Sequence, residues 1–170
     1  MGQDSISKKF DSKGGLMEIP WKNGNINGVQ KAYYKDGKLR IEGVFVDGKP
    51  SGVNRQYSPT GKLVRVSYFL NGFRNGPDTG YYENGKVQNV INFVDGKIEG
   101  LATSYDKDGN ISRESTYING VQNGIGKMYK KGMLWREITY GGKMSGTYIE
   151  YDDSGKVIRT VEYLDGKRKQ

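Results

Sequence analysis

Glycine recurs with a period of 24 residues along most of this 170-residue chain, and that period constrains the fold more than any other feature. The first glycine of the repeat is found at Gly24, Gly48, Gly72, Gly96, Gly120, Gly142 and Gly166, with a single shorter step of 22 residues. The second follows four residues later, at Gly28, Gly52, Gly76, Gly100, Gly124 and Gly146. The third is found at Gly37, Gly61, Gly85, Gly109, Gly132 and Gly155. A fixed period of this length predicts a repeat protein whose unit is one small supersecondary structure.

Tyrosine keeps the same period. It lies five residues after the second glycine in all six repeats, at Tyr33, Tyr57, Tyr81, Tyr105, Tyr129 and Tyr151. An aliphatic residue such as Leu39 follows the third glycine by two residues, and an aromatic residue such as Phe45 precedes the next first glycine. We interpret these tyrosines and the second glycines as structural positions, because each ring can pack on the neighbouring unit.

Each unit has the order turn, strand, turn, strand. Asn-Gly or Asp-Gly opens most units, as at Asn23-Gly24 and Asp47-Gly48, and this dipeptide is a strong hairpin signal because both residues tolerate positive φ. Apolar residues between the turns alternate with a period of two, and no stretch keeps a helical period. The expected fold is all-β: an elongated, single-layer antiparallel meander of tandem β-hairpins.

The repeat pattern divides the chain into three parts. We expect a degenerate N-terminal hairpin acting as a cap over residues 1–22, since Phe10, Gly14 and Leu16 occupy repeat positions within one residue. A tandem array of about six units of 24 residues then spans 23–166, and a basic tail follows at 167–170. The whole predicts about fourteen strands.

The turn lengths predict a strand register. A three-residue loop would pair Tyr33 with Leu39, and a two-residue loop at Lys131-Gly132 would pair Tyr129 with Leu134. Uninterrupted alternation from these pairs places two like-charged pairs on the tyrosine face, Arg55 opposite Arg65 and Lys127 opposite Arg136. Like charges in such pairs are destabilising. They indicate either a groove for anionic groups between aromatic walls, or long stems that cover the rings while the charges reach water.

Composition removes several classes of chemistry. The chain has no cysteine and no histidine, which excludes disulfides, cysteine-ligated metals and Ser-His or Cys-His catalysis. No pair of carboxylates stands apart from the repeat, so we expect no catalytic residue, no metal and no cofactor. Lysine and arginine number 27 against 19 acidic residues, a net charge of +8, which favours anionic partners.

The repeat resembles the MORN repeat, and more closely the bacterial MORN variant that many antitoxin or immunity components carry. The segment from Asp47-Gly48-Lys49-Pro50-Ser51-Gly52 through Tyr57 to Gly61-Lys62-Leu63 carries the resemblance well, and residues 23–166 follow the pattern. The resemblance implies a sheet of hairpins without catalysis in the repeats. It also implies a role as scaffold, dimerisation module or phospholipid binder, and an antitoxin would act by binding a protein partner.

We therefore expect a non-catalytic protein-interaction module, antitoxin-like in its action, that binds a partner along the face with aromatic and arginine side chains. The candidate binding residues are Arg55, Arg65, Arg113, Lys127, Arg136 and Arg159. Peripheral binding to anionic phospholipid or another polyanion is one alternative, favoured by the net charge, and an exported surface or adhesion-type protein is another. A protein partner is the first expectation, with a homodimer through the sheet ends and anionic lipid as further partners; nucleic acid is the weakest. The sequence as it stands is expected to be cytoplasmic, or exported or lipid-anchored if a signal has been removed.

Overall fold

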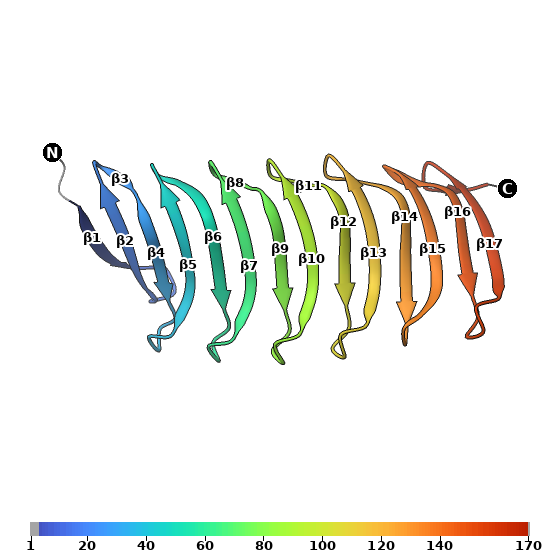
Figure 1. The fold of residues 1–170 in the computed structure, drawn as a ribbon, viewed down its shortest axis with the longest axis horizontal. Coiled ribbons are helices and arrows are strands. Elements are labelled where there is room, and N and C mark those ends of the chain that lie inside the picture. Colours follow the sequence, from blue (N-terminus) through green and yellow to red (C-terminus); the bar gives the residue numbers. More distant parts are fainter. Residues whose placement is uncertain (1–3, 170) are drawn as a thin grey trace. The chain divides into compact units, whose positions relative to one another are not determined.

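A computed structural model describes residues 4–169, which contain eighteen strands and no helix (Figure 1). Every strand pair is antiparallel, and consecutive strands pair in a meander. The chain divides into two compact units, Met1–Gly85 (unit 1) and Lys86–Gln170 (unit 2), which are described separately. The expected all-β meander of tandem hairpins is confirmed.

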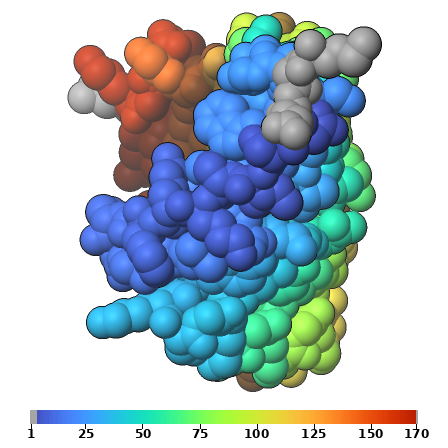
Figure 2. Space-filling view, turned by 90° about the vertical axis from the view of Figure 1, so that its left-hand side faces the viewer, coloured from blue at the N-terminus to red at the C-terminus, as the bar shows by residue number. Residues whose placement is uncertain are grey.

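Unit 1 holds the first nine strands, side by side in one layer (Figure 1). They are β1 (Ser5–Phe10), β2 (Leu16–Lys22), β3 (Asn25–Ile26), β4 (Gly28–Tyr33), β5 (Leu39–Val46), β6 (Lys49–Tyr57), β7 (Leu63–Leu70), β8 (Phe73–Arg74) and β9 (Gly76–Tyr81). Strand β1 is exposed along its whole length, and Figure 2 shows this dark-blue N-terminal segment facing the viewer.

Unit 2 repeats the arrangement with the remaining nine strands. They are β10 (Val87–Val94), β11 (Lys97–Ile98), β12 (Gly100–Tyr105), β13 (Ile111–Ile118), β14 (Val121–Lys130), β15 (Met133–Gly141), β16 (Lys143–Tyr151), β17 (Val157–Leu164) and β18 (Lys167–Arg168). Four of the eighteen strands in the described part are only two residues long: β3, β8, β11 and β18. Without them the number of strands is the fourteen expected from the sequence.

The upper turns, which contain the first glycines, link successive hairpins through the backbone. Asn23 (φ 51°) and Gly24 (φ 79°) both have positive φ, as a two-residue type I′ turn requires. The N–H of Gly48 donates to the carbonyl of Ile26 at 2.8 Å, and the N–H of Gly72 donates to that of Pro50 at 2.9 Å. Gly120, Gly142 and Gly166 make the corresponding bond in unit 2. Each upper turn is therefore tied to the residues that follow the turn before it.

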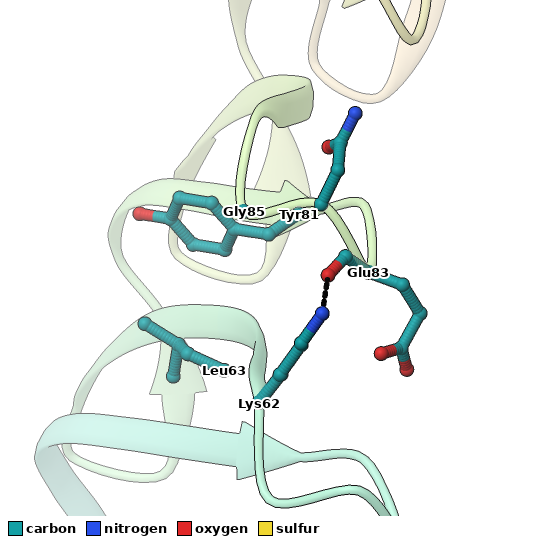
Figure 3. Close-up of a pocket in the computed structure, with 6 residues that line it drawn as sticks. Lys62, Leu63, Tyr81, Glu83 and Gly85 are labelled. Atoms are coloured by element: carbon teal, nitrogen blue, oxygen red, sulfur yellow. Dashed lines mark hydrogen bonds between the residues drawn. The ribbon is translucent and has the colours of Figure 1, made fainter.

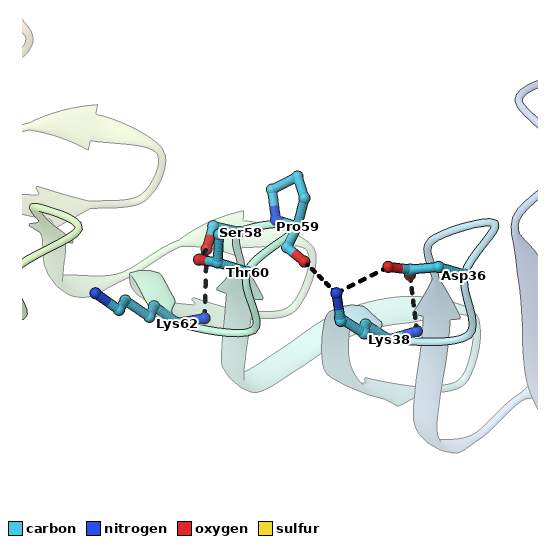
Figure 4. A network of polar contacts seen from close by, with 6 residues as sticks. All are labelled: Asp36, Lys38, Ser58, Pro59, Thr60 and Lys62. Atoms are coloured by element: carbon cyan, nitrogen blue, oxygen red, sulfur yellow. Dashed lines mark hydrogen bonds and ion pairs between the residues drawn. The ribbon is translucent and has the colours of Figure 1, made fainter.

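The lower turns, which contain the third glycines, are linked by lysine side chains. Lys38 Nζ donates to the carbonyl of Pro59 at 3.0 Å (Figure 4), and Lys62 Nζ donates to that of Glu83 at 2.5 Å (Figure 3). Lys86 makes the same bond to Asp108 in unit 2. These three turn lysines thus connect neighbouring turns while their side chains stay exposed.

A one-residue bulge in each of five hairpins changes the expected register. Tyr33 lies opposite Leu39, as expected, but Ala32 lies opposite Ile41, so Arg40 is an extra residue. The same shift occurs beside Tyr57, Tyr105, Tyr129 and Tyr151. Side chains alternate with a period of two, so one extra residue moves everything beyond it to the other face.

The expected like-charged pairs are wrong because of this bulge. Arg55 lies opposite Val66, and its Nη1 is 3.4 Å from Glu42 Oε1. Lys127 lies directly between Glu114 and Glu137 on the neighbouring strands. Both cations therefore face opposite charges, and no destabilising pair remains that would need a functional explanation.

Each unit has two distinct faces. The ladder face carries the repeat tyrosines and the glutamates they contact: Glu18 and Glu42 in unit 1, Glu114 and Glu137 in unit 2. The trough face carries the aromatic residues that precede the upper turns: Phe45 and Phe69 in unit 1, Phe93, Tyr117, Tyr140 and Tyr163 in unit 2. The buried strand residues, such as Ala32, Ile138 and Val161, lie on the trough face. The small core is therefore on that side of each unit.

Candidate interaction surface

The structure separates the predicted binding residues between the two faces. Arg55 and Lys127 lie on the ladder face, beside glutamates. The other four lie on the trough face: Arg65 in unit 1, and Arg113, Arg136 and Arg159 in unit 2. The face expected to carry all six together with the tyrosine ladder does not exist, because the bulges lie between the tyrosines and the arginines.

In unit 1, Arg65 is engaged by a buried carboxylate. Asp78 is only 1% exposed, and its Oδ1 accepts from Arg65 Nε at 2.7 Å. The hydroxyl of Ser67 donates to Asp78 Oδ2 at 2.7 Å, and Arg74 Nε lies 3.7 Å from the same oxygen. This cluster pairs the Arg65 guanidinium with a carboxylate of its own unit, so Arg65 is a weaker candidate for binding an acidic partner.

In unit 2, three arginines form a row on alternate strands. Arg113 is on β13, Arg136 on β15 and Arg159 on β17, with Met128 and Glu150 directly between them. We call these five residues the arginine row. It contains three cations and one carboxylate. Arg113 is exposed and, in the described part of the chain, bonds only the neutral Ser115 hydroxyl, at 3.2 Å.

Glu150 holds the C-terminal end of the arginine row in place. Its Oε1 accepts from Arg136 Nη2 at 2.7 Å and from the Tyr148 hydroxyl at 2.5 Å, while Arg159 Nη1 is 3.7 Å from Oε2. The Tyr148 hydroxyl first, and then Arg136, hold the pKa of Glu150 below its usual value. Burial, and then the bond to Glu150, raises the pKa of Tyr148. One carboxylate thus orients two arginines.

Aromatic rings pack against these guanidinium groups. Arg136 Cζ lies 4.0 Å from the Trp135 ring centroid and 5.1 Å from that of Tyr148, and Arg159 Cζ lies 5.8 Å from the latter. Such contacts favour a fixed guanidinium plane. Tyr148 also meets Tyr163 edge to face, with centroids 6.4 Å apart.

A second row of the trough face consists of tyrosines with a glycine opposite on one neighbouring strand, while Gln122 and Met144 lie opposite Tyr117 and Tyr140 on the other. Tyr117 lies opposite Gly100, Tyr140 opposite Gly124 and Tyr163 opposite Gly146. We call these three tyrosines the tyrosine row. Between it and the arginine row lies a floor of buried residues: Ser115, Gly126, Ile138 and Val161. Tyr148 lies between Ile138 and Val161 in the same line, so the arginine row and the tyrosine row run parallel on either side of these residues.

Two buried donors on this face have no hydrogen-bond partner among the described residues. They are Arg136 Nε and Gln122 Nε2. Gln122 lies opposite Tyr117, and its amide nitrogen is 3.1 Å from where a Cβ on Gly126 would stand. Buried donors are normally paired. Both nitrogens are covered by neighbouring side chains, so an acceptor on a partner could reach them only if those side chains moved.

The ladder face carries a regular set of tyrosine–glutamate bonds that sequence reasoning missed. Tyr33 donates to Glu18 at 2.8 Å and Tyr129 to Glu114 at 2.7 Å, and Tyr57 and Tyr151 make the same bond. The sequence signal is a glutamate fifteen residues before the tyrosine, or fourteen in the shortened unit. The bond to Glu114, with burial, raises the pKa of Tyr129 to about 12. At the positions that precede Tyr81 and Tyr105 by fifteen residues, valine replaces the glutamate.

The ladder face of unit 2 also exposes an apolar strip near the upper turns. Leu101 is 54% exposed, and Ile118 and Ile125 are each 50% exposed. Lys97 and Lys127 lie on the same face. This strip is the second surface of the molecule that suits a partner.

Other features give no site. In unit 1, the trough face has a hollow of about 150 Å³ lined by Gln30, Arg40, Phe45 and Asn54 among others. Residues 4–169 contain no cluster of acidic side chains that could hold a metal, and no helix there could cross a membrane.

Comparison with known families finds one match. The family described as MORN repeat variant matches residues 26–47, 74–95, 98–119 and 144–165, which together cover just over half of the chain. Three of the matched segments start at the last residue of a short upper strand, the fourth starts near the beginning of β16, and all four end beside the next upper turn. No curated protein matches the chain.

Proposed function

This chain belongs to the MORN repeat variant family, and from that premise we propose that it is a non-catalytic interaction module that binds an acidic protein through the trough face of unit 2. MORN repeats commonly bind proteins or membranes. The arginine row carries the proposal, because it places three guanidinium groups and one carboxylate on one face. If the function is antitoxin-like, the partner loses its activity when it is bound to the trough face.

Charge and burial favour this face over the ladder face. Arg136 and Arg159 are oriented by Glu150 and by aromatic rings, so little side-chain entropy is lost when they bind. Arg and Tyr are also the residues that most often dominate binding energy at protein interfaces. On the ladder face, by contrast, Arg55 and Lys127 are already balanced by glutamates.

The test compares two variants that lose the same number of charges. One carries Arg113→Gln, Arg136→Gln and Arg159→Gln; the other carries Lys31→Gln, Arg55→Gln and Lys127→Gln on the ladder face. Each is used to capture proteins from the source organism's lysate at low and high salt, with circular dichroism confirming the fold. We expect one protein to survive high salt with the parent chain and with the ladder-face variant, and to be lost with the trough-face variant. Equal capture by both variants would refute the proposed face.

A second candidate function is binding to an anionic membrane through the ladder face. The exposed strip of Leu101, Ile118 and Ile125 beside lysines is the specific observation that favours it. Cosedimentation with phosphatidylcholine vesicles, with and without phosphatidylserine, tests it. If the membrane is the target, a Leu101→Ser, Ile118→Ser double variant will release the protein from the anionic vesicles and the trough-face variant will not.

A further inference from the structure

We propose that the occupant of the unit 2 trough is an acidic polyproline II segment with a carboxylate at every third residue, lying across β13–β17 so that its carboxylates meet Arg113, Arg136 and Arg159. This inference rests on the proposed function, because it specifies which acidic partner the same face would bind. Two observations carry it: the arginines lie on every second strand, and the tyrosines of the same face have the same period.

The spacing of the arginine row fits one backbone conformation best. The arginines lie on every second strand, and strands are about 4.8 Å apart, so neighbouring arginines are separated by ~9.6 Å. A polyproline II helix has three residues per turn and rises about 3.1 Å per residue, which repeats the same side at ~9.3 Å. Over both intervals the mismatch is about 0.6 Å.

Other conformations fit less well. An extended β-strand presents the same side every second residue, at about 6.7 Å, which does not match the ~9.6 Å interval. An α-helix returns to the same side after seven residues, about 10.5 Å, and runs out of step by ~1.8 Å over two intervals. Of the three conformations, the polyproline II helix therefore has the repeat closest to the interval between the arginines.

The tyrosine row provides the surface on which such segments dock. Polyproline II ligands sit in aromatic-lined grooves, with their rings between aromatic ridges. Tyr117, Tyr140 and Tyr163 lie on alternate strands, with Gln122 and Met144 on the strands between them. The tyrosines have the same two-strand period as the arginines, so a ligand with one period can contact both rows.

The corresponding face of unit 1 also has aromatic residues opposite glycines, but it lacks the row of arginines, because Ile41 stands on β5 where unit 2 has an arginine. There Asp78 binds Arg65 from within the unit and occupies the floor of the trough with its own negative charge. An acidic segment would meet a carboxylate at this point. The proposal is therefore specific to unit 2.

The first experiment uses synthetic peptides and the full chain. A peptide of repeated Pro-Pro-Glu triplets is compared with Pro-Pro-Lys triplets, with a peptide of the same composition whose glutamates alternate between spacings of two and four, and with an alanine-rich helix bearing glutamate at every seventh position. Binding is followed by calorimetry and by the fluorescence of Trp135, which stacks on Arg136, in a Trp21→Phe background.

We expect the Pro-Pro-Glu peptide to bind at least about tenfold more tightly than the peptide with altered spacing, because only the regular peptide meets all three arginines. Tighter binding by the helix would overturn the proposal, as would equal binding by the two proline-rich acidic peptides. The Arg113→Gln, Arg136→Gln, Arg159→Gln variant should lose the preference, and the matched ladder-face variant should keep it.

The two proposals fail in different ways. If the trough-face variant loses a captured lysate protein but the Pro-Pro-Glu peptide shows no preference, the face is correct and the polyproline segment is wrong. If the trough-face variant captures as well as the parent chain, the proposed function itself is wrong. A Tyr140→Ala variant tests the tyrosine row independently of the arginine row. The polyproline proposal requires this variant to bind the regular peptide more weakly, and unchanged binding would refute the role of the tyrosine row.

Discussion

At the scale of single residues, the same side chain has different surroundings in different repeats. A repeat tyrosine donates to a glutamate on the previous hairpin at four positions, and valine replaces that glutamate before the other two. Repeat tyrosines with and without a glutamate partner can therefore be compared directly. Because the ring is the same at each position, the difference in stability between their phenylalanine variants measures the contribution of the hydroxyl–carboxylate hydrogen bond.

The first prediction compares two such tyrosines. Tyr129→Phe removes the donor to Glu114 and should destabilise the protein by about 1 kcal/mol, the usual value for a hydrogen bond of this kind. Tyr81→Phe is the control, because Val66 stands where the glutamate would be, and it should be neutral within about 0.5 kcal/mol. Urea unfolding of both variants gives the two free energies. Equal losses would show that the carboxylate contributes nothing.

The second prediction concerns alkaline pH. The pKa of Tyr129 is raised to about 12 in the folded chain, so folding favours its protonated form. Its contribution to stability is therefore complete below pH 10, the ordinary tyrosine value, and is lost as the pH rises toward about 12. Absorbance titration of the phenolate should show a late-ionising tyrosine that is absent from Tyr129→Phe. Ionisation of all tyrosines near pH 10 would contradict this.

The third prediction concerns the buried Asp78. Asp78→Ala leaves Arg65 without its carboxylate and the Ser67 hydroxyl without its acceptor. Because Arg65 is 35% exposed and can be hydrated, the expected loss is about 2–3 kcal/mol, below the full cost of breaking a buried ion pair. Denaturant unfolding measures it. A loss below 1 kcal/mol would mean that water replaces the carboxylate without difficulty.

At the scale of the hairpin, backbone conformation decides which glycines matter. Gly142 has φ +83° in an upper turn, while the adjacent Gly141 ends strand β15 with no atom near its missing Cβ. The fourth prediction follows: Gly142→Ala should cost about 1–2 kcal/mol, because an L side chain is strained at positive φ. Gly141→Ala should be neutral or slightly stabilising. Thermal unfolding of the pair checks this, and equal effects would contradict it.

Turn chemistry could be predicted from the sequence, and strand register could not. Asn-Gly and Asp-Gly specify positive φ locally, so the upper turns and the short loop at Lys131-Gly132 were predicted correctly. The bulge beside five of the repeat tyrosines has no local signature, because its extra residue is Arg40 in one hairpin and Trp135 in another. One unseen residue moved Arg55 and Lys127 to the opposite face from the other arginines. The six predicted binding residues are therefore divided between two faces.

At the scale of the whole molecule, charge is the property that both units share. The chain carries a net charge of +8 at neutral pH and has a sequence pI of about 9.4. On the trough face the two units differ: the buried Asp78 of unit 1 binds Arg65, whereas Arg113 of unit 2 bonds only the Ser115 hydroxyl among the described residues. Composition alone could not show that difference.

The fifth prediction is a measured isoelectric point at or above 9.4. The pKa values of Tyr33, Tyr57, Tyr129, Tyr148 and Tyr151 are all raised. Fewer phenolates therefore form near pH 10 than composition assumes, and the positive charge persists to higher pH. Isoelectric focusing of the folded chain, compared with the chain in urea, should show the folded value to be the higher. A lower folded value would refute the raised tyrosine pKa values.

The bonds between upper turns have a consequence for how such a chain can evolve. The donor is a glycine N–H and the acceptor a backbone carbonyl, supplied by Ile26, Pro50 or Met144 without regard to the side chain. A duplicated hairpin can therefore join its neighbours through the backbone whatever residues its two faces bear. Gene duplication would lengthen the protein first, and later substitutions would decide which hairpins acquire a binding surface and which do not.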